Sequence, residues 1–303
     1  MNHLITLVLS LAMSAQVAAP PNPELAKLVG ADVKVEKLGS GIQFGEGPLW
    51  IPADGGYLIF SDVPGKKLKR WDAAKGLTDF REVNGPNGNV LDGQGRLITC
   101  EETGRRLTLT EPDGTVRVLA DKFEDKKINS PNDVVVRNDG SIWFTDPPYG
   151  LPRGTAKDQE KNNVFRLDPK TGHLTAVVTD LDRPNGLCFS PDHKKLYIAD
   201  SGRPRHIKVF EVKEDGTLGP AAVFGQTDKG NPDGMKCDEQ GNLWVASGGI
   251  VVFSPDGKQI GRIALPEAAS NLAFGGADGR TIFITARTGL YSIKTSVRGA
   301  GLK

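Results

Sequence analysis

Apolar and polar residues alternate in short runs along most of the chain, and one arrangement recurs six times. Each unit begins with a polar side chain, continues into an apolar run, turns at Asp, Asn or Gly, and ends in a second apolar run. Apolar runs separated by such turns are typical of β-hairpins. The units are EGPLWIPADGGYLIFSD from Glu46, NGNVLDGQGRLITCE from Asn87, NDVVVRNDGSIWFTD from Asn132, NGLCFSPDHKKLYIAD from Asn185, DGMKCDEQGNLWVAS from Asp233 and NLAFGGADGRTIFITA from Asn271.

The spacing of these units predicts their architecture. Their starting positions are 41, 45, 53, 48 and 38 residues apart, a range typical of four-stranded propeller blades. After Asn271 there is room for only three strands, ending near Ile293, so one strand must come from elsewhere. The alternating segment VKVEKL, residues 33–38, can supply it. We therefore predict an all-β fold, a six-bladed β-propeller whose N-terminal strand closes the last blade.

The N-terminus differs from the rest of the chain. Leu4 to Met13 form an apolar run followed by SAQVAA, a pattern that resembles a secretory leader. The sequence thus predicts a signal peptide at residues 1–19, an N-terminal extension at 20–32 and the propeller at 33–303. A leader of this kind implies a periplasmic or secreted protein.

Composition limits the partners. Lys and Arg number 38 and Asp and Glu 37, a formal net charge of +1, which gives no electrostatic basis for binding nucleic acid or a membrane surface. We expect a small-molecule ligand, no membrane association once the leader is removed, and no protein partner. The three cysteines lack CxxC spacing and are expected to be buried apolar residues of strands.

The predicted propeller brings the polar starts of the six units together. First strands line the central channel, so Glu46, Asn87, Asn132, Asn185, Asp233 and Asn271 should surround one mouth. The second strand of each blade returns to the same face, which would place Asp62, Glu101, Asp146 and Asp200 there too. These are hard oxygen ligands without His or Cys, and such a set favours Ca²⁺ or Mg²⁺.

A structural interpretation competes with this one. PNG, PND and PDG are good turn sequences, and a single such turn is more often structural than functional. Glu46, however, has no special turn chemistry and occupies the same position as the amides. Because carboxylates pointing into one channel would repel each other without a cation, the coincidence favours a metal site.

The longest of these motifs identify a resemblance. GEGPLW, PNGNVLDGQGRL, SPNDVVVRNDGSIWFTDPPYG, RPNGLCFSPDHKKLYIAD and NPDGMKCDEQGNLWVA resemble the blade motifs of the senescence-marker protein and gluconolactonase family, which includes regucalcin and bacterial sugar lactonases. The resemblance covers residues 33–293. It implies that Glu46, Asn185 and Asp233 bind a catalytic divalent cation, with Asn132 as a fourth ligand, and that Asn87 contacts substrate. It also implies Asp233 as the general base. Because a carboxylate bound to a dication is a weaker base, Asp146 and Asp200 are alternatives.

The function expected from this resemblance is divalent-metal-dependent hydrolysis of a sugar lactone, by polarising the carbonyl and activating water. Ca²⁺ is the favoured cation, with Mg²⁺, Mn²⁺ and Zn²⁺ as alternatives. Two other functions stay open: hydrolysis of a phosphotriester or other ester at the same site, and a noncatalytic binding propeller with a structural cation.

Further substrate contacts are expected around the mouth. Glu101 should lie there as the end of a second strand, and Arg105 is a candidate for a basic substrate contact. The loop at residues 147–163 interrupts the third blade on the mouth face, and long loops on a rigid scaffold commonly carry specificity. We predict a partial lid there, with Tyr149 and Arg153 as contacts. A solvated charged loop is the alternative.

Overall fold

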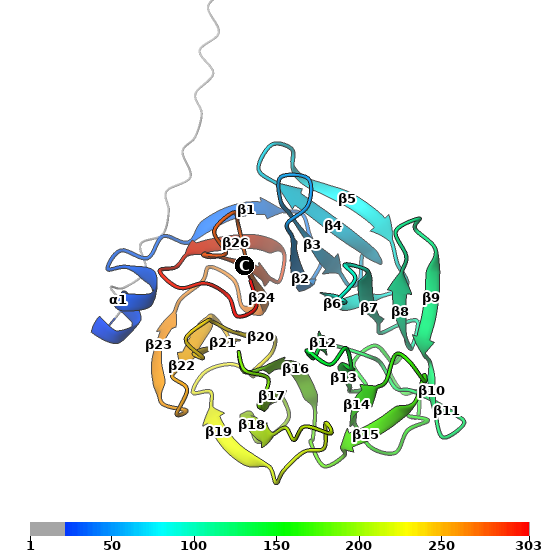
Figure 1. Ribbon diagram of the computed structural model, residues 1–303. Coiled ribbons are helices and arrows are strands. Elements are labelled where there is room, and N and C mark those ends of the chain that lie inside the picture. The colour runs from blue at the N-terminus through cyan, green and yellow to red at the C-terminus, as the bar shows by residue number, and fades with distance from the viewer. Residues whose placement is uncertain (1–21, 303) are drawn as a thin grey trace, which may run out of the picture.

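Six four-stranded antiparallel sheets are arranged as blades in a ring (Figure 1). The computed structural model describes residues 22–302. The blades follow one another around the ring in chain order, and the last blade lies beside the first. The prediction of a six-bladed β-propeller is confirmed. The predicted leader, residues 1–19, lies outside the described residues.

The first three blades and a small hairpin occupy the first half of the chain. Blade 1 contains β2 (Gly45–Ile51), β3 (Tyr57–Asp62), β4 (Lys67–Asp72) and β5 (Gly76–Glu82). Blade 2 contains β6 (Pro86–Leu91), β7 (Leu97–Glu101), β8 (Arg106–Thr110) and β9 (Val116–Ala120). The hairpin of β10 (Lys122–Phe123) and β11 (Lys126–Lys127) precedes blade 3, which contains β12 (Val134–Val136), β13 (Ile142–Asp146), β14 (Asn163–Leu167) and β15 (Leu174–Val178).

The other three blades complete the ring. Blade 4 contains β16 (Pro184–Phe189), β17 (Lys195–Asp200), β18 (His206–Glu211) and β19 (Ala222–Gln226). Blade 5 contains β20 (Met235–Cys237), β21 (Leu243–Ala246), β22 (Ile250–Phe253) and β23 (Gln259–Ile263). Blade 6 contains β24 (Ala269–Gly275), β25 (Thr281–Ala286), β26 (Gly289–Lys294) and the N-terminal β1 (Glu36–Ser40).

An N-terminal strand closes the ring, as predicted. β1 pairs antiparallel with β26, from Glu36 opposite Ser292 to Ser40 opposite Gly289. The strand begins three residues later than the expected segment 33–38. Blade 6 therefore joins the two ends of the chain, and Figure 1 shows blue β1 beside red β26.

A short helix that the sequence interpretation missed lies in the N-terminal extension. In α1 (Pro23–Val29), Asn22 caps the first turn by accepting a hydrogen bond from the backbone N–H of Leu25. Leu25 and its apolar neighbours are buried in one core cluster with blades 5 and 6. Within residues 22–302 no helix has the length and apolarity needed to cross a bilayer.

Aspartates shape many of the hairpin turns. Asp92, Asp139 and Asp238 each accept a hydrogen bond from the backbone N–H two residues later, at 2.9 Å. Asx turns of this kind let a short polar side chain replace a backbone acceptor. These aspartates therefore help to fix where the apolar run reverses direction in their hairpins.

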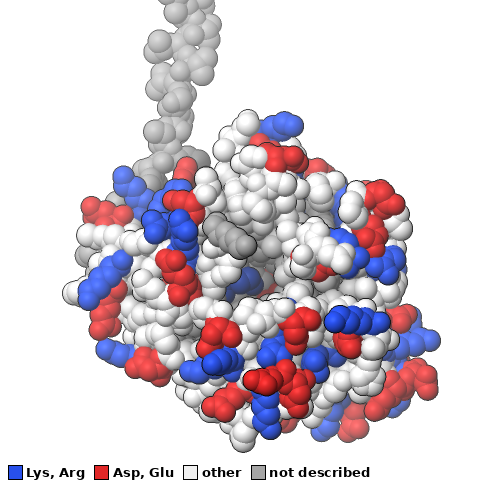
Figure 2. Space-filling model, viewed as in Figure 1, with Lys and Arg blue, Asp and Glu red and all other residues white. Residues whose placement is uncertain are grey.

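The core lies between neighbouring sheets. Trp50 of blade 1 stacks on Phe283 of blade 6 with ring centroids 5.2 Å apart, and Trp143 of blade 3 meets Phe189 of blade 4 edge to face at 5.6 Å. All three cysteines are buried and unbridged, as expected for residues that pack within strands. Acidic and basic side chains are interspersed over the face drawn in Figure 2.

Glycines let the inner strands approach each other around the axis. Gly186 follows Asn185 in β16, and a Cβ built there would lie 2.3 Å from the carbonyl oxygen of Asp233 and 2.7 Å from Cα of Gly234. Both neighbouring atoms belong to the backbone of blade 5, so neither can rotate away. Glycine at this position therefore sets the distance between two blades next to Asn185 and Asp233.

We expect Gly186→Ala to lower the free energy of unfolding by roughly 2–4 kcal/mol, because the added methyl group must force two backbones apart. Urea denaturation measures the change. Gly93→Ala is the matched control, because a Cβ at Gly93 meets no atom within 4 Å. Equal stability of the two variants would contradict the close packing of blades 4 and 5.

Candidate active site

A cavity of about 320 Å³ opens where the inner strands begin. Five of the six unit-starting residues line it, and each comes from a different blade. They are Glu46, Asn87, Asn132, Asn185 and Asp233. The sixth, Asn271, supports the cavity, because its Nδ2 donates a hydrogen bond to Oε2 of Glu46 at 3.2 Å. The structure thus brings the predicted unit starts together.

Two carboxylates and two amides form the candidate metal site. Glu46, Asn132 and Asn185 are each less than 9% exposed. Asn185 also forms a side-chain hydrogen bond with Asp233, and this bond partly offsets the increase in the pKa of Asp233. In residues 22–302, no group of three or more His, Cys, Asp or Glu side chains could hold a metal ion. A cation here therefore needs the amide oxygens as well as the carboxylates.

A third carboxylate, Asp133, lies close enough to act on both acids. Its charge raises the pKa values of Glu46 and Asp233. Oδ1 of Asp133 accepts the backbone N–H of Val134 at 2.9 Å, whereas its buried Oδ2 has no hydrogen-bond partner among the described residues. Asp133 does not line the cavity, but its charge adds to an electronegative site at Glu46 and Asp233, which favours a cation there.

Burial and mutual repulsion raise the pKa values of both carboxyls of the candidate metal site. Withdrawal from water raises the pKa of Asp233 to about 8, with a further increase from the charge of Asp133. Burial also raises the pKa of Glu46 well above its ordinary value, followed by the charges of Asp233 and Asp133. Carboxyls of raised pKa in a cavity are typical of functional sites. A bound dication would favour their ionised forms.

Tyr149 lines the cavity from the loop after β13, where the sequence predicted a substrate contact. Burial raises its pKa to about 12, and the charge of Asp233 adds to the increase. Its phenol consequently stays protonated near neutral pH and can donate a hydrogen bond into the cavity. Arg153, the other contact predicted in this loop, is absent from the lining.

Glu102, not Glu101, reaches the cavity. Glu102 Oε2 accepts a hydrogen bond from Nδ2 of Asn87 at 2.9 Å, and both side chains line the space. Glu101 instead pairs with Arg106 at 2.8 Å and accepts a hydrogen bond from Thr108 at 3.1 Å. The expected placement of Glu101 at the mouth is wrong by one residue, and Glu102 is a cavity residue that sequence analysis missed.

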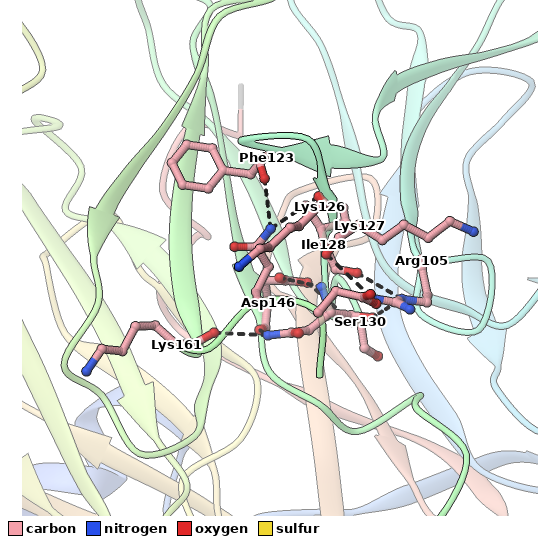
Figure 3. Close-up of polar contacts among 11 residues, drawn as sticks. Arg105, Phe123, Lys126, Lys127, Ile128, Ser130, Asp146 and Lys161 are labelled. Carbon is pink, nitrogen blue, oxygen red and sulfur yellow. Dashed lines mark hydrogen bonds and ion pairs between the residues drawn. The ribbon is translucent and has the colours of Figure 1, made fainter. Parts of the chain in front are cut away.

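Arg105 also lies elsewhere, because its side chain anchors loops (Figure 3). Its Nε donates to the carbonyls of Ile128 and Asn129 at 2.9 and 3.0 Å, and its Nη2 pairs with Asp158 at 2.5 Å. Asp158 belongs to the predicted lid, so Arg105 ties that loop to the segment before blade 3. Its guanidinium is engaged by these groups rather than by the cavity.

The acids that end the second strands are bound to backbone. Asp146 accepts the N–H groups of Asn129 and Ser130, both at 2.7 Å (Figure 3). Asp62 and Asp200 likewise each accept two N–H groups just before the first strand of their own blades. None of the three lines the cavity. Of the three candidate bases, Asp233 alone lines the cavity, whereas Asp146 and Asp200 hold backbone N–H groups.

Fold and site together define a six-bladed propeller with a carboxylate and amide cavity at one mouth of its channel. The family model described as "SMP-30/Gluconolactonase/LRE-like region" matches residues 44–288. The chain belongs to this family, as the sequence motifs indicated.

Named relatives share most of the chain. A gluconolactonase of Zymomonas mobilis is 33% identical over 92% of this chain and 86% of its own length. A regucalcin of Xenopus laevis is 31% identical over 80% of this chain and 83% of its own. The solved structure of a gluconolactonase of Xanthomonas campestris matches with a TM-score of 0.84 and 33% identity, covering 94% of this chain and 99% of that one.

Proposed function

We propose that this protein hydrolyses sugar lactones with one divalent cation, favouring Ca²⁺, held by Glu46, Asn132, Asn185 and Asp233. The observation that carries the proposal is the convergence of these four oxygen-bearing side chains in one cavity. The lactonase names of relatives that match most of the chain support it. The leader predicted at residues 1–19 supports export of the enzyme to the periplasm or outside the cell.

The residues of the cavity have separable tasks in this reaction. When bound, the cation would polarise the lactone carbonyl and stabilise charge that develops on its oxygen. Asp233 accepts a proton from the attacking water, because its side chain lines the cavity. Asn87 and Glu102 offer donors and acceptors for ring hydroxyls, and the Tyr149 phenol donates a hydrogen bond from the loop.

Hydrolysis of glucono-1,5-lactone tests the proposal directly. Protein stripped with a chelator is assayed alone and after Ca²⁺, Mg²⁺, Mn²⁺ or Zn²⁺ is restored, with spontaneous ring opening subtracted. We expect activity only with a restored cation. A phosphotriester assayed in parallel separates the two hydrolase classes. Cation binding without turnover of any lactone would reject the proposed activity and favour a binding propeller.

The stability of the cation-free protein should fall as pH rises. Above about pH 4 the Asp233 carboxyl ionises in the unfolded chain, whereas the folded protein retains this proton up to a pKa of about 8. Stability is therefore lost between these pH values, by up to about 1.4 kcal/mol per pH unit for each such proton. Glu46 contributes in the same direction.

Calcium should reverse this trend, because it binds the ionised carboxylates and must displace the retained protons. Thermal unfolding between pH 5 and 8.5, with and without Ca²⁺, measures both effects. We expect the calcium-induced increase in Tm to grow with pH. An increase that is independent of pH would contradict the assignment of these two acids as ligands.

A further inference from the structure

A second hollow, of about 340 Å³, adjoins the candidate active site. Arg183, Ser201 and Asn231 line both spaces, so the two are continuous. The second hollow adds Arg203, Arg205 and Asp182. We call it the arginine pocket, after Arg183, Arg203 and Arg205. The roles given above to the active-site residues do not account for it.

Blade 4 holds the backbone of this pocket in place. Asp200, at the end of β17, accepts the N–H groups of Asp182 at 3.1 Å, Arg183 at 2.8 Å and Gly202 at 3.2 Å. The Oδ2 atom of Asp182 accepts the N–H of Arg203 at 2.9 Å. Two loops that flank β16 and β17 are thus tied to each other. The three arginines project from a fixed backbone rather than from independent surface segments.

The pocket carries excess positive charge. Its only acid is Asp182, whose carboxylate is directed at the backbone of the 202–203 turn. Over residues 22–302, none of its three guanidinium groups lies within 4.0 Å of a carboxylate, whereas Arg105, Arg106 and Arg262 all form ion pairs. The charge of Arg183 also reaches the hydroxyl of Tyr149 in the active site. Unpaired arginines beside a substrate cavity are suited to carboxylates and phosphates.

We propose that the arginine pocket binds an anionic substituent of the lactone substrate, a carboxylate or phosphate remote from the ring carbonyl. This inference rests on the proposed lactonase function and narrows its substrate class. The neutral ring and its carbonyl occupy the cavity beside Glu46 and Asp233, and the anionic group extends past Arg183 toward Arg203 and Arg205. Neutral sugar lactones fill only the first of the two spaces.

Paired substrates test the proposal. The value of kcat/KM is measured for neutral glucono-1,5-lactone, for its 6-phosphate and for glucaro-1,4-lactone, which carries a free carboxylate. We expect one anionic lactone to exceed the neutral one by about tenfold or more at low salt. The preference should shrink as ionic strength rises, because exposed charges are screened. The two anionic arms distinguish a phosphate site from a carboxylate site.

Arginine variants link the preference to the pocket. Arg203→Gln with Arg205→Gln should reduce the ratio of anionic to neutral kcat/KM by roughly fivefold to tenfold. Arg117→Gln is the control, because Arg117 pairs with Glu111 in blade 2 and lies outside both spaces. Equal kcat/KM values for all three lactones, or a preference unchanged in the double variant, would overturn the proposal.

A binding measurement separates this proposal from the proposed reaction. Calorimetric titration of 6-phosphogluconate, glucarate and gluconate requires no turnover. Binding of glucarate or 6-phosphogluconate that is tighter than binding of gluconate, and that weakens in the double variant, supports the pocket even if no lactone is hydrolysed. Hydrolysis of neutral lactone without any preference for the anionic lactones supports the lactonase and rejects the pocket.

Discussion

Glu46→Gln is expected to lower cation-dependent lactone hydrolysis by about 10³-fold or more and to weaken Ca²⁺ binding by at least about 100-fold. The side chain is buried at the cavity and is fixed by hydrogen bonds from Gly47 and Asn271. An amide of similar shape can keep part of this geometry while removing one of the negative charges that hold the dication. Steady-state kinetics and calorimetry measure the two effects.

The same change should stabilise the cation-free protein. Burial, followed by the charges of Asp233 and Asp133, raises the pKa of Glu46, so the cation-free folded protein must hold a proton that the unfolded chain releases near neutral pH, whereas a neutral amide carries no such cost. We expect a higher Tm in chelator and a much smaller increase on adding Ca²⁺. Glu111→Gln, outside the cavity, serves as the control. A Glu46→Gln protein with a normal calcium response would rule this residue out as a ligand.

Asp233→Asn separates metal binding from proton transfer. The amide keeps an oxygen ligand but cannot accept the proton of an attacking water, so we expect kcat to fall by roughly 10²–10⁴-fold. Ca²⁺ affinity should decrease less than in Glu46→Gln. The variant sequence contains Asn followed by Gly234 and can deamidate back to Asp, so intact mass must accompany each assay.

Two outcomes would count against Asp233 as the base. Full turnover in Asp233→Asn would remove its proposed role outright. Weaker Ca²⁺ binding, with the activity lost at limiting Ca²⁺ fully restored at saturating Ca²⁺, would assign Asp233 to metal binding alone. A reduced kcat at saturating Ca²⁺ is the result that supports proton transfer.

The fold was accessible from sequence because local signals repeat. Asp92, Asp139 and Asp238 mark hairpins through hydrogen bonds within two residues of chain, so each turn can be identified without knowledge of the rest. Repetition then fixes the blade count. The helix at Pro23–Val29 was missed because it is only seven residues long and depends on packing against distant blades.

The site was accessible in part for the same reason. Equivalent positions of repeated strands lie at equivalent places around an axis, so the amino-acid sequence alone groups Glu46, Asn132, Asn185 and Asp233. The errors occur where a strand ends. Glu101 and Glu102 are adjacent, and alternation sends consecutive side chains to opposite sides. Which of the two reaches the cavity depends on the end of β7, which the sequence does not specify.

The sequence also does not specify which groups a given polar side chain contacts. Asp146 could equally have faced the channel or the loop before its own blade, and two short backbone hydrogen bonds fix it on the loop. Arg105 has a positive φ of 53° and reaches carbonyls that are more than twenty residues away in sequence. Contacts of this range follow from the assembled loops and not from a local pattern.

Closure of the last blade has a kinetic consequence. The hydrogen bond from Asn271 to Glu46 joins residues 225 positions apart, and the β1–β26 pairing joins the two ends of the propeller. Contacts of such high sequence separation form slowly, because a long loop must close before they contribute. A chain in which only the first five blades have assembled lacks the hydrogen bond from Asn271 that holds the Glu46 carboxylate. During refolding, we therefore expect the candidate cation site to form only when the whole ring is complete, and partly folded chains to lack lactonase activity.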